Sequence, residues 1–249
     1  MAVFVWVFFF GALISQYIAW VKTTGWVWQD VYGLILLLGL CGGPAIILSD
    51  RNQRLPAAGR FGLSIRRLPK TLAISLLHFG VATGLTMLTL MATMQICKWF
   101  GHDAIPVHET LTNLRTSPTF RSTLMLAIPA VLLAPIMEEL FFRGMVQCFF
   151  IWMGGFLLMR RQGGPKKEPQ GGFPSLSVSP LSRWAGIVIT AALFALYHQN
   201  WQHMPALFIL AMGMGYAYER YGNLLIPILI HSFFNLLQVA ATLLNRLPD

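Results

Sequence analysis

Charged residues are scarce in this chain of 249 residues, where Asp, Glu, Lys and Arg together make up 11%. A soluble domain carries about 25% of such residues. Hydrophobic residues reach 56%, and the mean hydropathy is +0.62. This scarcity of charge excludes an ordinary soluble fold, and we predict an all-α, polytopic bundle of transmembrane helices. The length accommodates one such membrane domain and no second soluble one.

Cysteine and acidic residues are also few. Cys41, Cys97 and Cys148 lie in or at the edge of apolar runs, form no CxxC and are odd in number, which supports neither a disulfide framework nor a zinc knuckle. The net charge is +9, but the basic residues stand in short loops between apolar runs. There they follow the positive-inside rule and face anionic lipid headgroups. No basic stripe with interleaved aromatics is present, so no nucleic-acid partner is expected.

Long apolar runs predict the membrane spans, since roughly 17–25 apolar residues cross a bilayer. About seven are expected, within a range of six to eight, at residues 2–21, 31–49, 71–98, 122–158, 184–201, 204–219 and 224–244. The first run lacks a basic leader and a small-x-small cleavage site, which favours a transmembrane helix over a signal peptide. The fourth run is too long for one perpendicular helix. It is either tilted and bent, or continued by an interfacial helix after Arg143.

The distribution of basic loops predicts the orientation of the chain. The loops after the second and fourth runs carry most of the Lys and Arg residues, and both are expected in the cytoplasm. The N-terminus is then cytoplasmic, and the protein is integral to the membrane, with the cell membrane as the expected location. The Gly-, Pro- and Ser-rich stretch 162–180 is predicted to be a flexible linker.

Glu138, Glu139 and Arg143 interrupt the longest apolar run, where Gln147 is the other strongly polar residue. A charged side chain in hydrocarbon costs roughly 2.5–3.5 kcal/mol on insertion scales. Helix packing does not require that cost to be met at adjacent positions. The two carboxylates are therefore the first candidates for a functional site.

Two further polar pairs stand in the second half of the chain, Phe194-x-x-x-His198 and His231-x-x-x-Asn235. A spacing of four places both members of a pair on one helix face, as it does for Glu139 and Arg143. Glu138 is turned by about 100° from Glu139, so it points elsewhere. A free carboxylate beside an imidazole can take a proton from water, and a second imidazole with a carboxamide can stabilise an oxyanion.

Each pair also has a purely structural interpretation. Glu139 with Arg143 is then an ion pair that joins helices, and His198 an ordinary interfacial histidine. His231 with Asn235 would serve as hydrogen-bonding glue between helices. The occurrence of all three groups in one bundle favours a shared site. His78 is interpreted as packing, and no role is assigned to the other three histidines, which are His102, His108 and His203.

The ordered set EExxxR, FxxxH and HxxxN resembles the CPBP intramembrane proteases, the group that contains CAAX prenyl proteases, bacteriocin-processing enzymes and Abi-like proteins. The resemblance covers roughly residues 122–240, including the approach to the last motif from Gly215 to His231. It implies a catalytic core at 121–249, whereas residues 1–120 form the variable N-terminal helices. It also implies an intramembrane peptidase that cuts a membrane-anchored or lipidated peptide or protein in the lipid bilayer.

The resemblance assigns a role to each motif residue. Glu138 is the base that activates water, and His198 holds that water. Glu139 and Arg143 are the orienting pair, while His231 and Asn235 stabilise the oxyanion. The family has also been described as zinc metalloproteases, which makes Glu138, His198 and His231 the alternative ligands. HExxH is missing, and a glutamate mechanism without cofactor is favoured.

Two other classes of function are alternatives to the peptidase. A proton-coupled transporter would use Glu138, Glu139 and Arg143 as a relay, but transporters often show internal repeats and this short chain shows none. A non-proteolytic, immunity-type membrane protein would keep the fold without catalysis. The intact motifs favour the peptidase.

Overall fold

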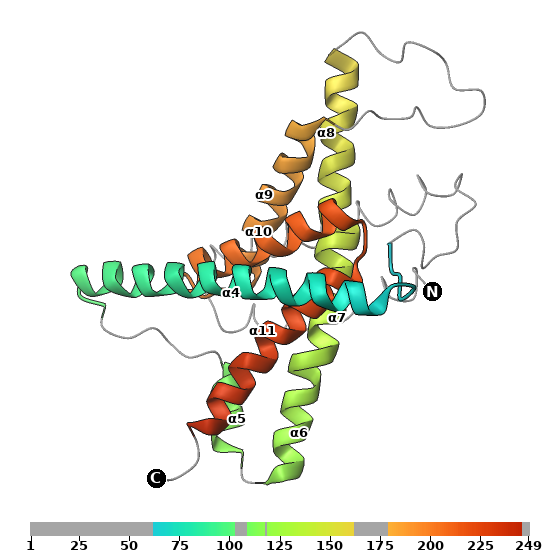
Figure 1. Ribbon diagram of the computed structural model, residues 1–249. Helices are drawn as coiled ribbons and strands as arrows, with labels where there is room; N and C mark the ends of the chain where they lie inside the picture. Colours follow the sequence, from blue (N-terminus) through green and yellow to red (C-terminus); the bar gives the residue numbers. More distant parts are fainter. Residues whose placement is uncertain (1–61, 103–108, 118, 162–178, 246–249) are drawn as a thin grey trace, which may run out of the picture.

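The computed structural model describes residues 62–102, 109–117, 119–161 and 179–245 (Figure 1). The predicted spans 2–21 and 31–49, and the linker up to residue 178, lie outside the described residues. Every regular element in the described ranges is a helix, which confirms the all-α prediction. In chain order these elements are α4 (Leu68–Trp99), α5 (Glu109–Thr116), α6 (Phe120–Ile128), η2 (Pro129–Leu133), α7 (Ala134–Phe141), η3 (Phe142–Gln147), α8 (Cys148–Arg161), α9 (Pro180–Tyr197), α10 (Met204–Tyr221) and α11 (Leu225–Leu244).

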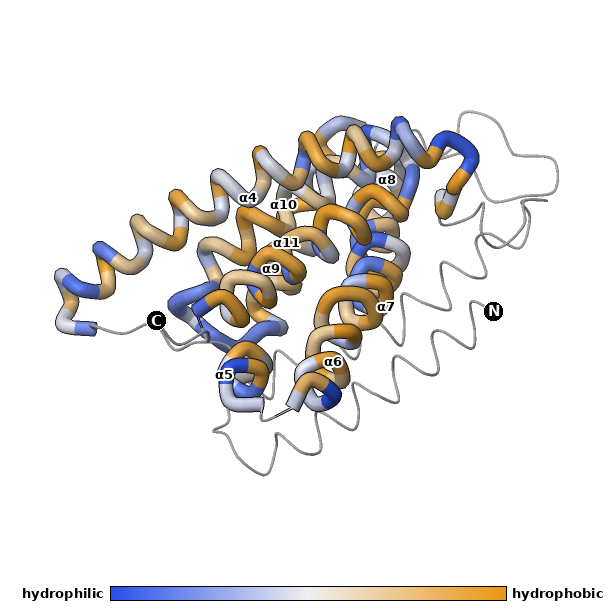
Figure 2. The backbone as a smooth tube through the Cα atoms, turned by 60° about the horizontal axis from the view of Figure 1, so that its bottom comes forward, coloured by the Kyte–Doolittle hydropathy of each residue, from blue (hydrophilic) through white to orange (hydrophobic). Residues whose placement is uncertain are grey.

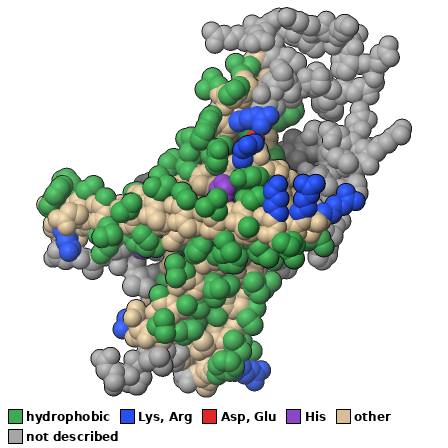
Figure 3. Space-filling view, in the orientation of Figure 1, with side chains coloured by type: hydrophobic (Ala, Val, Ile, Leu, Met, Phe, Trp, Pro, Cys, Tyr) green, Lys and Arg blue, Asp and Glu red, His purple; other side chains and the backbone are tan. Residues whose placement is uncertain are grey.

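Within the described residues, four helices are long and apolar enough to cross a membrane. They are Leu68–Trp99, Phe120–Leu158, Pro180–Tyr197 and Leu225–Leu244. Their apolar side chains cover much of the surface (Figure 3), and polar residues concentrate at helix ends and connections (Figure 2). The protein is therefore integral to the membrane. The helix α10 coincides with another predicted span without being among these four, and the total of about seven stays a prediction.

The fourth apolar run forms one continuous helical column, α6–η2–α7–η3–α8 (Figure 1). Its apolar part has 39 residues, which at 1.5 Å per residue is about 58 Å, nearly twice the hydrocarbon core. Two π-helical segments, η2 and η3, flank α7 on either side. Pro135 gives a local reason for η2, because its ring would clash with the carbonyl of Val131 in a regular α-helix. Segments of this kind occur frequently at functional sites.

The helix α9 begins and ends earlier than the predicted span 184–201. The hydroxyl of Ser179 accepts a hydrogen bond from the Ser182 amide at 3.1 Å, and Pro180 follows as the first helical residue. Both features favour a helix start. At the other end, Gln199 has a φ of 55°, a conformation that terminates the helix. His198 therefore caps α9 instead of lying within it.

The helix α4 packs against α10 and α11, although it falls in the region predicted to be variable. Ala82 of α4 lies in the same buried cluster as Phe142, Phe194 and Met214. A Cβ added at Gly213 of α10 would lie 3.1 Å from the Ala82 side chain. The helix α4 is thus part of the same packed bundle as the helices that follow residue 120, and the boundary between a variable and a catalytic region stays a prediction.

Candidate active site

Glu139 and Arg143 form the predicted ion pair. The Glu139 Oε1 accepts a hydrogen bond from Arg143 Nη1 at 2.9 Å, and both side chains have 0% exposure. Arg143 Nη2 also donates to the carbonyl of Ala211 on α10 at 3.1 Å. The guanidinium carbon lies 4.8 Å from the centre of the Phe194 ring. Arg143 therefore joins three helices through a carboxylate, a carbonyl and an aromatic face.

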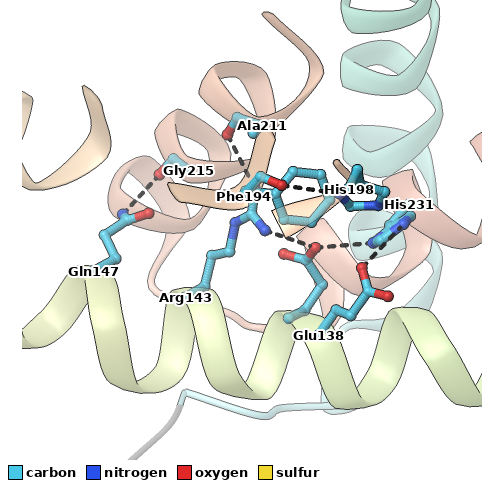
Figure 4. Close-up of polar contacts among 9 residues, drawn as sticks. Glu138, Arg143, Gln147, Phe194, His198, Ala211, Gly215 and His231 are labelled. Atoms are coloured by element: carbon cyan, nitrogen blue, oxygen red, sulfur yellow. Dashed lines mark hydrogen bonds and ion pairs between the residues drawn. The ribbon is translucent and has the colours of Figure 1, made fainter. Parts of the chain in front are cut away.

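His231 of α11 contacts both carboxylates of α7 (Figure 4). Its Nδ1 lies 3.0 Å from Glu139 Oε1, and its Nε2 lies 3.9 Å from Glu138 Oε2. An ionised carboxylate accepts hydrogen bonds only, so Nδ1 carries a hydrogen in this pair. A single oxygen of Glu139 thus accepts from Arg143 and from His231. The sequence motifs predicted the first contact but not the second.

Glu138 differs from its neighbour in surroundings. Its side chain is 17% exposed, against 0% for Glu139. Its Oε2 has no hydrogen-bond partner among the residues that the structure describes. His231 Nε2 lies 3.9 Å from this oxygen, which is beyond hydrogen-bonding distance. The Oε2 atom itself is buried, so a hydrogen bond to it from water requires a water molecule to enter the site.

The Phe194-x-x-x-His198 motif folds back on itself at the end of α9. His198 Nδ1 lies 2.8 Å from the carbonyl oxygen of Phe194, so Nδ1 donates and a neutral ring presents Nε2 as an acceptor. The Phe194 ring centre is 4.6 Å from that of His198 and 5.7 Å from that of His231. Phe194 thereby supports both imidazoles and the arginine, and Figure 4 shows Phe194, His198 and His231 close together above Glu138.

Asn235 lies one helical turn beyond His231 on α11. Its Nδ2 donates to the carbonyl of Ala130 in η2 at 2.8 Å. This contact ties the last helix to the first π-helical segment, while His231 ties it to Glu139. One amide hydrogen of Asn235 is occupied in this way, and the amide carries a second.

Gln147, to which the sequence analysis gave no role, is fully buried in η3. Its Nε2 donates to the carbonyl of Gly215 at 3.1 Å and lies 3.5 Å from Glu219 Oε1. A Cβ at Gly215 would lie 2.8 Å from Gln147 Oε1, so a larger residue there would displace the Gln147 amide. Arg143 and Gln147, four residues apart, thus bind α10 carbonyls that are also four residues apart. The sequence signal for these contacts was limited to the spacing of four residues between Arg143 and Gln147, which places both on one helix face.

The alternative zinc ligands are Glu138, His198 and His231. Among the residues described, no group of three His, Cys, Asp or Glu side chains could hold a metal ion. Glu138 and His231 lie near each other, but His198 does not complete a ligand set with them. The Nδ1 atoms of both histidines contact a carbonyl and a carboxylate, an arrangement that is also usual for metal-binding histidines, which bind the ion through the other ring nitrogen.

Residues 120–237 match the model of a protein family described as type II CAAX prenyl endopeptidase Rce1-like. The match includes all three motifs and confirms the resemblance to CPBP and CAAX proteases. The class defined by this match and by the helical membrane fold is that of CAAX protease-like peptidases. Residues 120–237 are therefore similar to a family of hydrolases. No curated protein and no solved structure matches it in the same comparisons.

Proposed function

We propose that the protein is an intramembrane endopeptidase that hydrolyses a peptide bond of a membrane-anchored or lipidated substrate, with Glu138 as the base. The observation that carries this proposal is the different pairing of the two glutamates. Glu139 is paired with Arg143 and His231 through Oε1, whereas the nearest contact of Glu138 with His231 is 3.9 Å long. The Oε2 atoms of both glutamates are buried without a hydrogen-bond partner in the described structure. A base must be able to accept a proton, and a carboxylate already paired with an arginine is a poor one.

The proposed reaction follows from this geometry. A water held by Glu138 and His198 gives its proton to Glu138 as its oxygen attacks the scissile carbonyl carbon. The C–N bond then breaks, and the proton on Glu138 passes to the leaving nitrogen. His231, when doubly protonated, donates from Nδ1 to Glu139 and from Nε2 toward the oxyanion. The second amide hydrogen of Asn235 is the other proposed donor, because preorganised donors stabilise developing charge.

The family name supports a lipidated substrate, since it describes prenyl endopeptidases. A site built from helices that can cross a membrane also favours a substrate anchored in the same bilayer. We further propose the cell membrane as the location, with the N-terminus in the cytoplasm. In this proposal residues 121–249 are the catalytic core, to which the variable region adds the supporting helix α4.

The experiment that tests the function is peptidase activity of the purified chain in proteoliposomes that contain a membrane-anchored fluorogenic peptide. Cleavage that requires the anchor supports an intramembrane peptidase. Absence of cleavage of prenylated and unprenylated anchored peptides alike would favour a non-proteolytic membrane protein. Proton flux without cleavage would favour the transporter.

Activity is expected to survive exhaustive chelation, with well under one zinc per chain by metal analysis. The reason is that Glu138 itself supplies the base, and Asn235 is a poor zinc ligand but a good oxyanion donor. The measurement is the cleavage rate before and after dialysis against a chelator. Activity that disappears with the chelator and returns with added zinc would make the protein a metalloprotease.

Asn235→Ala is expected to lower the turnover rate by about 10²–10³, as removal of one oxyanion donor does elsewhere. The Michaelis constant should change little, because the donor acts on charge that develops after binding. Steady-state kinetics separate the two parameters. Thr242→Ala, also on α11, is the matched control, since its hydroxyl bonds only to the Gln238 carbonyl of its own helix. An equal loss in both variants would assign Asn235 a structural role alone.

A further inference from the structure

The ends of four helices meet at one end of the bundle. The helices α4, α9 and α11 begin there, and α10 ends there. Arg183 near the start of α9 pairs with Glu219 near the end of α10 at 3.7 Å. His78 of α4 contacts Tyr221 of α10 edge-on, with ring centres 5.3 Å apart. Contacts between different helices therefore fix this arrangement.

The segment before α4 is fastened to the turn between α10 and α11. Ser64 N donates to Asn223 Oδ1 at 3.2 Å, and Asn223 Nδ2 donates to Ser64 O at 3.0 Å. Gly62 has a φ of +64°, and a Cβ there would collide with the carbonyl oxygen of Gly222. This reciprocal pair holds the following basic residues beside the end of α10.

Exposed basic side chains gather at this end of the bundle, and together they define the basic patch: Arg66, Arg67, Lys70, Arg183 and Arg220. Figure 3 shows Lys and Arg side chains collected over the start of α4 and the adjoining helix ends. Glu219 is the acidic residue described here, and it turns inward, with Oε1 3.5 Å from Gln147 Nε2. Arg183 is the member of the patch that pairs with it. The patch is therefore strongly positive.

The surface next to the patch is apolar. On α4, Leu68, Leu76 and Leu77 are 43%, 53% and 66% exposed. Trp184 follows Arg183 and stacks on Tyr216, with ring centres 6.0 Å apart. Tryptophan and tyrosine favour the boundary between headgroups and hydrocarbon. Positive charge above a lipid-facing apolar surface suits an amphiphile with an anionic head better than a free anion.

We propose that the basic patch binds the phosphate of an anionic phospholipid at the cytoplasmic leaflet, with the acyl chains along α4. Guanidinium groups pair well with phosphate oxygens, and basic residues near a membrane surface are attracted to anionic leaflets. This binding does not depend on the peptidase activity. It anchors the end of the bundle at which α4, α9 and α11 begin.

The test uses the purified full chain in neutral detergent, titrated with dioleoylphosphatidylglycerol or, at equal mole fraction, dioleoylphosphatidylcholine. The readout is the melting temperature. The anionic lipid is expected to raise it in a saturable way and the neutral lipid is not. The triple variant R66Q/R67Q/K70Q should weaken the apparent affinity by about 100-fold, at roughly fivefold for each of the three charges. Its melting temperature in the neutral lipid should equal that of the wild type, which shows an intact fold.

The matched control is K98Q/R115Q/R121Q, which removes the same charge from exposed positions outside the patch. It should keep the wild-type affinity, and R66K/R67K should keep most of it. If both triple variants lost the same apparent affinity for the anionic lipid, the net charge of the protein would explain the binding, and the proposal would be overturned. If glycerol 3-phosphate or inorganic phosphate raised the melting temperature as much as the anionic lipid does, the ligand of the patch would be a soluble phosphate, and the proposal of a lipid would be overturned. No response to the anionic lipid would also overturn the proposal.

Discussion

Glu138→Gln is expected to abolish peptidase activity while the protein remains folded. Glutamine keeps the shape of the side chain, but its amide cannot take the proton from water. General-base catalysis contributes about 10²–10⁴ in rate, and the loss should be at least of that size. The fold should tolerate the change, because Glu138 is partly exposed and its Oε2 has no partner among the described residues.

The measurement is the cleavage rate of the anchored peptide, with the melting temperature recorded on the same preparations. Glu219→Gln is the matched control, a glutamate of the same bundle that pairs with Arg183 and Gln147 and not with the motif residues. It should retain most of the activity. A Glu138→Gln protein that cleaves at the wild-type rate would transfer the base role to another group, and equal inactivity of the control would indicate a general loss of structure.

The parts of the site that the sequence predicts are those set by local geometry. The pairing of Glu139 with Arg143 follows from a spacing of four residues on one helix, and the structure confirms it. The helical class follows from apolar runs of membrane length, and is likewise confirmed. In both cases the information lies within one segment of the chain, so no knowledge of its neighbours is needed.

The parts that the sequence does not predict depend on contacts between distant segments. His231 and Glu139 are 92 residues apart, and nothing in either motif identifies the other as its partner. The bonds from Asn235 to Ala130 and from Gln147 to Gly215 span 105 and 68 residues. Each places a polar side chain on a backbone carbonyl, which carries no sequence signal. The π-helical segments η2 and η3 were missed as well, because hydropathy does not distinguish them from α-helix.

The early start of α9 shows a different limit. The sequence has a Ser-x-x-Ser pattern with proline at the first helical position, from Ser179 to Ser182, and that start signal was available. Hydropathy placed the beginning later because Ser182 and Arg183 lower the apolar average there. Arg183 is nevertheless helical, since its charge stays outside the core and pairs with Glu219. The first residue of an apolar run and the first residue of a helix can therefore differ.

Arg143→Leu is expected to destabilise the protein by about 3–5 kcal/mol, the usual loss when one partner of a buried ion pair is removed. The substitution leaves the Glu139 carboxylate fully buried with His231 as its one remaining partner in the described structure, and it also breaks the bond to Ala211. The measurement is the melting temperature in a fixed neutral detergent, together with the yield of folded protein.

The matched control is Arg183→Leu. Its side chain is 52% exposed, its Nη1 lies 3.7 Å from Glu219 Oε2, and an exposed pair of that kind contributes about 0–1 kcal/mol. The double variant Glu139→Gln/Arg143→Leu separates the causes, because it removes the buried charge together with its partner. It should be more stable than Arg143→Leu alone if the stranded carboxylate causes the loss. Equal melting temperatures for the single and double variants would instead assign the loss to the Arg143 contacts with Ala211 and Phe194, since a double-mutant comparison isolates the pairwise interaction.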